Sequence, residues 1–160
     1  MQSRTSFFLI RVLPFIVVLG GVGVVIGLFL FSDNHIVSDT VRTSIHMNSY
    51  DFDVRVAQNA KDRQQGLSGS SLMENEGMLF VFESPDYHSL WMKDMLVSLD
   101  MIWLDALGVV VHILENVHPE TFPTIFTPKE KALYVLELPA GAIDRVGVKI
   151  GDKIEIPTSF

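Results

Sequence analysis

The uncharged stretch over residues 12–31 constrains the fold of this 160-residue chain more than any other feature. A helix of that length, rising ~1.5 Å per residue, would cross the ~30 Å hydrocarbon layer of a bilayer. Pro14 lies in the first turn of this helix, where its missing N–H costs little. We therefore expect one transmembrane helix over residues 12–31.

The charges on either side of this stretch indicate its orientation. Arg4 and Arg11 precede it, whereas Asp33 and Asp39 follow it. By the positive-inside rule, residues 1–11 stay in the cytoplasm, and the rest lies outside the inner (plasma) membrane, in the periplasm or on the cell surface. A cleaved signal peptide is the alternative, but its apolar region is usually about 7 to 15 residues long and ends in a small-x-small site. An uncleaved anchor fits better.

Gly23 and Gly27 have the small-xxx-small spacing with which two membrane helices approach each other closely. This spacing is compatible with a homodimer through the anchor. Because glycine is common in membrane helices, a monomeric anchor is the alternative.

The remainder of the chain is acidic and contains no cysteine. All 19 acidic residues follow residue 31, whereas two of the 12 lysines and arginines precede residue 12, which leaves a net charge of −9 outside the membrane. We expect no nucleic-acid partner, because phosphate binding needs a basic face. The absence of cysteine excludes disulfides, thiolate metal sites and cysteine nucleophiles.

Residues 32–49 are polar and predict a tether, and residues 50–160 predict one domain. Asn59 is suited to cap a short helix that ends at Gly66, and a second short helix is expected from Pro139 to Gly147. Alternating or continuous apolar patterns predict the strands. These strands are residues 50–56, 78–82, 88–92, 99–104, 109–114 and 133–138, with two short pieces within 148–156.

The strands follow one another too closely for helical crossovers, so the expected fold is α+β and mainly antiparallel. We expect a compact, partly closed barrel-like domain with two short helices. The hairpin of residues 99–104 and 109–114 is expected at the centre of the sheet. Residues 119–128 contain three prolines and predict a long irregular loop.

Several motifs resemble one family in order and spacing. They are Lys-Asp-Arg-Gln-Gln-Gly-Leu at 61–67, Glu-Gly-Met-Leu-Phe-Val-Phe at 76–82, Trp-Met-Lys-Asp at 91–94, Leu99-Asp100 followed by Asp105, and Tyr-Val-Leu-Glu-Leu-Pro-Ala-Gly at 134–141. Over residues 52–155 the chain resembles the bacterial and archaeal domain of unknown function 192 family. Asp94 and Ser98 depart from it, since the family usually has Asn and Pro there. The resemblance implies a compact β-rich domain, often exported or membrane-anchored, and no established activity or catalytic residue.

The segment 91–94 combines an indole, a thioether, an ammonium group and a carboxylate. In a strand, Trp91 and Lys93 would face one way, and Met92 and Asp94 the other. Trp91 and Lys93 could then hold an anionic or sugar-like ligand by stacking and charge-assisted hydrogen bonds. In the alternative interpretation, Trp91 and Met92 fill the core and Lys93 pairs with a nearby acid.

Asp100 and Glu137 each interrupt an apolar strand. An unpaired buried carboxylate is costly, so each needs a partner or contact with solvent. Both could hold backbone N–H groups in place, or they could form the acid pair of a hydrolase that acts on envelope polysaccharide.

A soft-metal site at His88, Met92 and Met95 is a weaker alternative, because thioether and imidazole ligands suit Cu(I) but methionine also fills cores. No phosphate-binding glycine loop, nucleophile elbow or zinc-protease motif occurs, so we expect no cofactor and binding rather than catalysis.

The sequence therefore predicts a membrane-anchored binding or accessory module that faces outward. The loop over residues 119–128 is a candidate cover for the site. The hydrolase, and an assembly protein that dimerises through Gly23 and Gly27, are the alternatives. The expected ligand residues are Trp91, Lys93, Asp94, Asp100 and Glu137.

Overall fold

The computed structural model describes residues 12–18, 24–30 and 41–157, in two compact units, Met1–Ser38 and Asp39–Phe160. In the first unit, within the stretch predicted to be helical, β1 (Val12–Val18) and β2 (Val24–Leu30) pair antiparallel. No helix in the described ranges is long and apolar enough to cross a membrane. Residues 19–23 and 31 lie outside the described residues, so the anchor stays a prediction, as does the dimer through Gly23 and Gly27.

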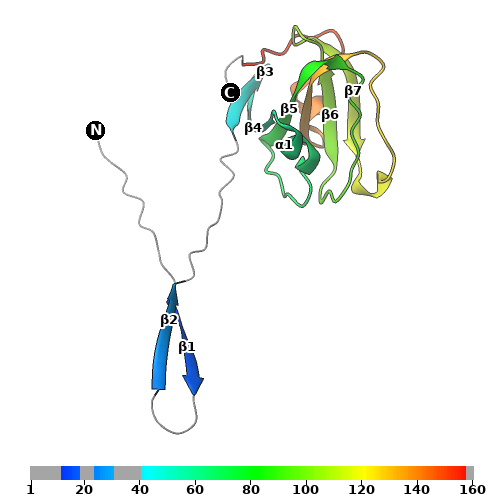
Figure 1. The fold of residues 1–160 in the computed structure, drawn as a ribbon. Coiled ribbons are helices and arrows are strands. Elements are labelled where there is room, and N and C mark those ends of the chain that lie inside the picture. The colour runs from blue at the N-terminus through cyan, green and yellow to red at the C-terminus, as the bar shows by residue number, and fades with distance from the viewer. Residues whose placement is uncertain (1–11, 19–23, 31–40, 158–160) are drawn as a thin grey trace, which may run out of the picture. The chain divides into compact units, whose positions relative to one another are not determined.

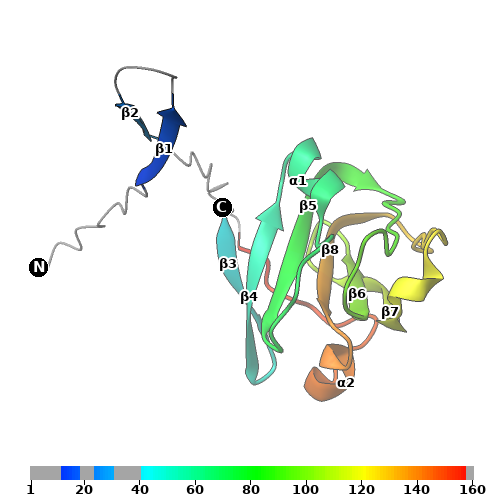
Figure 2. The same cartoon turned by 90° about the horizontal axis from the view of Figure 1, so that it is seen from below.

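The second unit is built around one six-stranded sheet with the order β3-β4-β5-β8-β6-β7 (Figures 1 and 2). Its strands are β3 (Arg42–Met47), β4 (Tyr50–Ala57), β5 (Glu76–Asp86), β6 (Leu99–Leu104), β7 (Val110–Val117) and β8 (Ala132–Pro139). The helices of this unit are α1 (Ala60–Gln65), α2 (Ala142–Val146) and the 3-10 turn η1 (Pro119–Thr121). This confirms a mainly β domain with two short helices. The sheet has β3 and β7 at its edges, so the predicted barrel-like closure is wrong.

One pair of neighbouring strands, β4 and β5, is parallel, with Asp53 beside Glu76. The connection over residues 58–75 contains α1 and a loop, and a parallel crossover needs a dozen or more residues. The helix follows local signals: the side chain of Asn59 accepts a hydrogen bond from the Asp62 amide, and Gly66 ends the helix with a φ of +52°.

Four expected elements differ in the structure. β8 inserts between β5 and β6, so the β6–β7 hairpin lies at one side of the sheet and not at its centre. Residues 88–92 form no strand and contribute a single bridge, Leu90 to Phe126. The second helix begins later than expected, because Pro139 ends β8 and Gly141 is the N-cap of α2. Residues 148–156 form no strand and contribute only the bridge of Lys153 to Val109.

β3 lies in the part of the chain that the sequence assigned to the tether. Its antiparallel pairing with β4 runs from Arg42 opposite Arg55 to Met47 opposite Tyr50. Ile45 and Met47 are its buried side chains. The folded domain therefore begins before residue 50.

The sheet packs against a hydrophobic cluster on each face, and every residue of β6 is buried. We call one side the α2 face, where Ile102 and Leu136 pack with residues of α2 and with Ile154. On the other side, the Trp103 face, Trp103 packs with residues of the β4–β5 and β5–β6 connections, including Leu67 and Met92. Figure 2 shows α1 and α2 at opposite ends of the strands.

Candidate functional site

Glu137 is a carboxylic acid in the interior of the sheet. It lies on β8 between Met78 of β5 and Met101 of β6, on the Trp103 face, and only 4% of it is exposed. Burial raises the pKa of Glu137 to about 8, against an opposing effect of the Arg55 charge. At neutral pH the group is therefore mostly protonated and uncharged.

The carboxyl group of Glu137 takes part in no side-chain hydrogen bond or ion pair within residues 41–157. In the described part of the chain, every side-chain oxygen or nitrogen that is sealed from solvent has a hydrogen-bond partner. The Glu137 carboxyl group therefore reaches an open space, where a hydrogen-bonding molecule can contact it.

That space is a pocket of about 140 Å³ between the end of α1 and the segment 89–95. Its walls combine apolar and aromatic side chains with a few polar groups, as is typical of small-molecule sites. The apolar wall consists of Leu67, Phe80, Leu90, Trp91 and Met95, and the polar groups include Arg63, Ser68, Ser89, Lys93 and Glu137.

Hydrogen bonds to its backbone hold the segment 91–94 in place over the sheet. The Ser68 hydroxyl donates to the carbonyl oxygen of Lys93 at 2.9 Å, and the Gly69 amide donates to that of Asp94 at 2.8 Å. The predicted division of side chains holds in part, because Met92 is buried whereas Trp91 and Lys93 line the pocket. Asp94 has a φ of +55° and does not line the pocket.

Trp91 forms an aromatic wall at the mouth of the pocket, with half of its surface exposed. The Lys93 Nζ lies 5.9 Å from the centre of the Trp91 ring, close enough for a cation–π contact. Phe122 packs its edge on the same indole, at 5.7 Å between ring centres.

The loop over residues 119–128 lies beside this wall and does not cover it. Leu90 and Phe126 exchange two backbone hydrogen bonds, of 2.9 and 2.8 Å, and the hydroxyl groups of Ser89 and Thr127 lie 2.8 Å apart. No residue of the loop lines the pocket.

Asp100 lies elsewhere and has a structural role. It is 1% exposed, and its Oδ1 accepts a hydrogen bond from the Asn116 amide at 2.8 Å while its Oδ2 accepts one from the Ile143 amide at 2.9 Å. The side chain thus joins β6 to β7 and to the first turn of α2. Asp100 is therefore on the α2 face, away from Glu137, and the acid pair that the hydrolase hypothesis requires is not formed.

The residues of the alternative metal site, His88, Met92 and Met95, have different surroundings. His88 stacks on Phe82 at 3.5 Å between ring centres, and its Nε2 lies 3.0 Å from the carbonyl oxygen of Ser84. Met92 is buried in the core, whereas Met95 lines the pocket. Within the described ranges, no group of three or more His, Asp or Glu side chains is arranged to hold a metal ion.

Arg63 is a wall residue that the sequence analysis did not single out, although it lies in the 61–67 motif. Its guanidinium group donates to the carbonyl oxygens of Gln58 and Val81 at 2.9 and 3.0 Å and to Glu83 at 3.2 Å. These bonds fix α1 against β5, and with it the rim of the pocket. A lone arginine on a short polar helix gives no sequence signal for such contacts.

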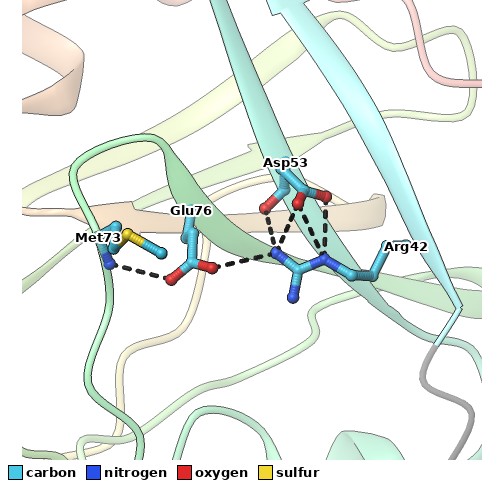
Figure 3. Close-up of polar contacts among 4 residues, drawn as sticks. All are labelled: Arg42, Asp53, Met73 and Glu76. Carbon is cyan, nitrogen blue, oxygen red and sulfur yellow. Dashed lines mark hydrogen bonds and ion pairs between the residues drawn. The ribbon is translucent and has the colours of Figure 1, made fainter.

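A second group of charges lies on the same side of the sheet, across β3, β4 and β5. Figure 3 shows Arg42 between Asp53 and Glu76. Its Nε donates to both carboxylate oxygens of Asp53 at 3.0 Å, and its Nη2 donates to Oε1 of Glu76 at 3.3 Å. Glu76 also accepts a hydrogen bond from the Met73 amide at 3.0 Å. The charge of Arg42 is thus compensated, whereas Arg55 forms no ion pair with a described residue and acts on Glu137 through space.

Comparison with protein families identifies the class. Residues 41–156 match the model of DUF192, described as an uncharacterized ACR family, and the chain belongs to this family. The match includes β3 through β8 and every residue of the pocket.

Two curated relatives, both called UPF0127 protein, come from archaea. The protein of Thermococcus sibiricus is 40% identical over 67 residues, which is 42% of this chain and 41% of the relative. That of Thermococcus gammatolerans is 38% identical over 87 residues, which is 50% of this chain and 51% of the relative. The chain therefore spans about half the length of these relatives or less.

Two crystal structures have the same fold. A protein of Sinorhizobium meliloti 1021, provisionally described as a transcription regulator, has a TM-score of 0.69 and 31% identity over 72% of this chain and 94% of its own. A protein of unknown function from Novosphingobium aromaticivorans has a TM-score of 0.69 and 28% identity over 76% of this chain and 90% of its own.

Proposed function

We propose that this chain is a membrane-anchored binding module whose outer domain holds a small polar ligand in the Glu137 pocket. One observation carries the proposal: a buried carboxyl group without a hydrogen-bond partner among the described residues opens into a pocket. Because the carboxyl oxygens of Glu137 are not sealed from solvent, water can hydrogen-bond to them in the free protein. A ligand that takes the place of this water and hydrogen-bonds to Glu137 keeps these bonds, and it gains the contacts of the apolar wall in addition.

The location rests on the sequence. The apolar residues 12–31 and the arginines before them support an anchor whose N-terminus is cytoplasmic. The net charge of −9 beyond the anchor does not favour nucleic acid as a ligand.

Binding is tested by thermal unfolding of the full-length chain in detergent, against separate panels of sugars, amines, carboxylates and nucleotides. A ligand at 100 times its dissociation constant stabilises the folded state by about 2.7 kcal/mol. We expect stabilisation by one class, lost in Glu137→Leu and kept in Leu107→Ala, which changes an exposed residue outside this pocket. Stabilisation that persists in Glu137→Leu would contradict the proposed site.

Topology is tested separately with single cysteines, since the chain has none of its own. A membrane-impermeant maleimide added to spheroplasts should label Ser71→Cys and leave Ser3→Cys unlabelled. Labelling of Ser3→Cys alone would reject the proposed orientation.

A further inference from the structure

We infer that the ligand of the Glu137 pocket is an uncharged, hydroxyl-bearing ring, such as one saccharide unit, stacked on Trp91. This inference rests on the proposed binding function and deepens it. It follows from the size of the pocket, its aromatic wall and the charges around it.

The size of the pocket suits a ligand of one ring. At about 140 Å³ the pocket is similar in size to a cavity of about 150 Å³ that binds benzene. This volume suits a single six-membered ring, part of which extends past the half-exposed Trp91 into solvent.

The walls of the pocket suit a ring with one apolar face and a polar edge. The C–H groups of a saccharide face can pack on the indole of Trp91, which combines apolar area with little loss of side-chain freedom. Hydroxyl groups at the edge of the ring then meet the deeper carboxyl group of Glu137 and the ammonium group of Lys93.

The charges of the pocket favour a neutral ligand. An uncharged carboxylic acid offers one donor and one acceptor, which is what a hydroxyl group needs. Arg63 is occupied by Glu83 and two carbonyl oxygens, so Lys93 is the one cation of the pocket without an ion-pair partner within residues 41–157. A single exposed ammonium group screened by water holds an anion weakly.

The two tryptophans of the chain make binding directly visible. Trp103 is fully buried and Trp91 is half exposed, so acrylamide quenches Trp91 selectively. We would titrate the full-length chain, in a detergent without a sugar headgroup, with glucose, galactose and N-acetylglucosamine, and in parallel with propylamine and acetate. Isothermal titration calorimetry gives the affinity of each probe.

We expect a sugar to protect Trp91 from acrylamide and its affinity to fall about tenfold or more in Trp91→Ala and in Glu137→Leu. Glu137→Gln keeps a donor and an acceptor, so it should retain binding, and Leu107→Ala is the control. If only propylamine or acetate binds, and Glu137→Leu abolishes this, the binding module stands and the saccharide inference is wrong. If no probe binds and none of the four ligand panels stabilises the chain, or if sugar affinity is unchanged in Trp91→Ala and Glu137→Leu, both are wrong.

Discussion

Asp100 and Glu137 lie on neighbouring strands, one residue out of register, and face opposite sides of the sheet. Asp100 is paired with Leu138, and Glu137 with Met101. Because side chains alternate along a strand, this offset separates the two buried acids. Asp100 holds backbone amides on the α2 face, whereas Glu137 opens into the pocket on the Trp103 face.

Glu137 should make the domain less stable as the pH rises. Its pKa is about 8 in the folded state against 4.5 in the unfolded chain, so between these values the folded state retains a proton that the unfolded state releases. The free energy of unfolding then falls with rising pH by at most about 1.4 kcal/mol per unit, and levels off above pH 8. This sign is the reverse of that for an acid whose pKa is lowered by folding.

Glu137→Gln removes this titration. We expect its stability relative to wild type to be lowest near pH 4.5 and to rise steadily up to pH 8. Urea unfolding of both proteins across this range measures the difference. Parallel pH profiles of the two proteins would show that Glu137 does not titrate in this way.

Asp100 should matter for stability and not for binding. Asp100→Ala removes two hydrogen bonds to buried or partly buried amides, at about 1.5 kcal/mol each, so we expect a loss of about 3 kcal/mol. Asp100→Asn keeps one acceptor and should lose less. Asp144→Asn, at an exposed position nearby, is the matched control in urea unfolding. If Asp100→Asn bound the ligand more weakly under conditions in which the variant is fully folded, Asp100 would have a role in binding, and this prediction would be wrong.

Local signals explain which parts of the fold could be predicted. The alternation in β4 and the capping residues Asn59 and Gly66 are decided by near neighbours in sequence, and the structure has them as predicted. The insertion of β8 between β5 and β6 depends on pairing between distant segments, which no local pattern encodes. β3 was missed because only Ile45 and Met47 of its six residues are buried.

The site could be predicted in part for the same reason. Glu137 is identifiable as a polar residue in an apolar strand, and Trp91 and Lys93 as unusual neighbours. The sequence does not show that Asp100 lies on the other face, because this depends on the register between β6 and β8. It also does not show that Ser68 lines the pocket, because this depends on the contact between the loop after α1 and the segment 91–94.

Gly77 should tolerate no side chain, because β8 passes directly against it. A Cβ at this position would overlap the backbone oxygen of Glu137 and lie 2.8 Å from Leu138 Cδ2. Gly77→Ala must displace β8, at a cost of about 3 kcal/mol. Gly69→Ala is the control: its φ of +68° is unfavourable for alanine, but nothing lies within 4 Å, so about 1 kcal/mol is expected. Equal losses for the two variants in urea unfolding would contradict the close approach of β8.

Arg63 and Arg42 should differ in what they contribute to stability. The Arg63 side chain is 17% exposed and satisfies two backbone carbonyl oxygens, so Arg63→Ala should cost about 2 kcal/mol and loosen the rim of the pocket. Arg42 is 39% exposed in its ion pair with Asp53, so Arg42→Ala should cost less than about 1 kcal/mol. In 1 M salt the Arg42 effect should largely vanish, because the Debye length falls to about 3 Å, whereas most of the Arg63 effect should remain. Equal salt sensitivity of the two variants in urea unfolding would show that Arg63 acts mainly through its exposed partner Glu83, and not through the carbonyl groups that fix α1 to β5.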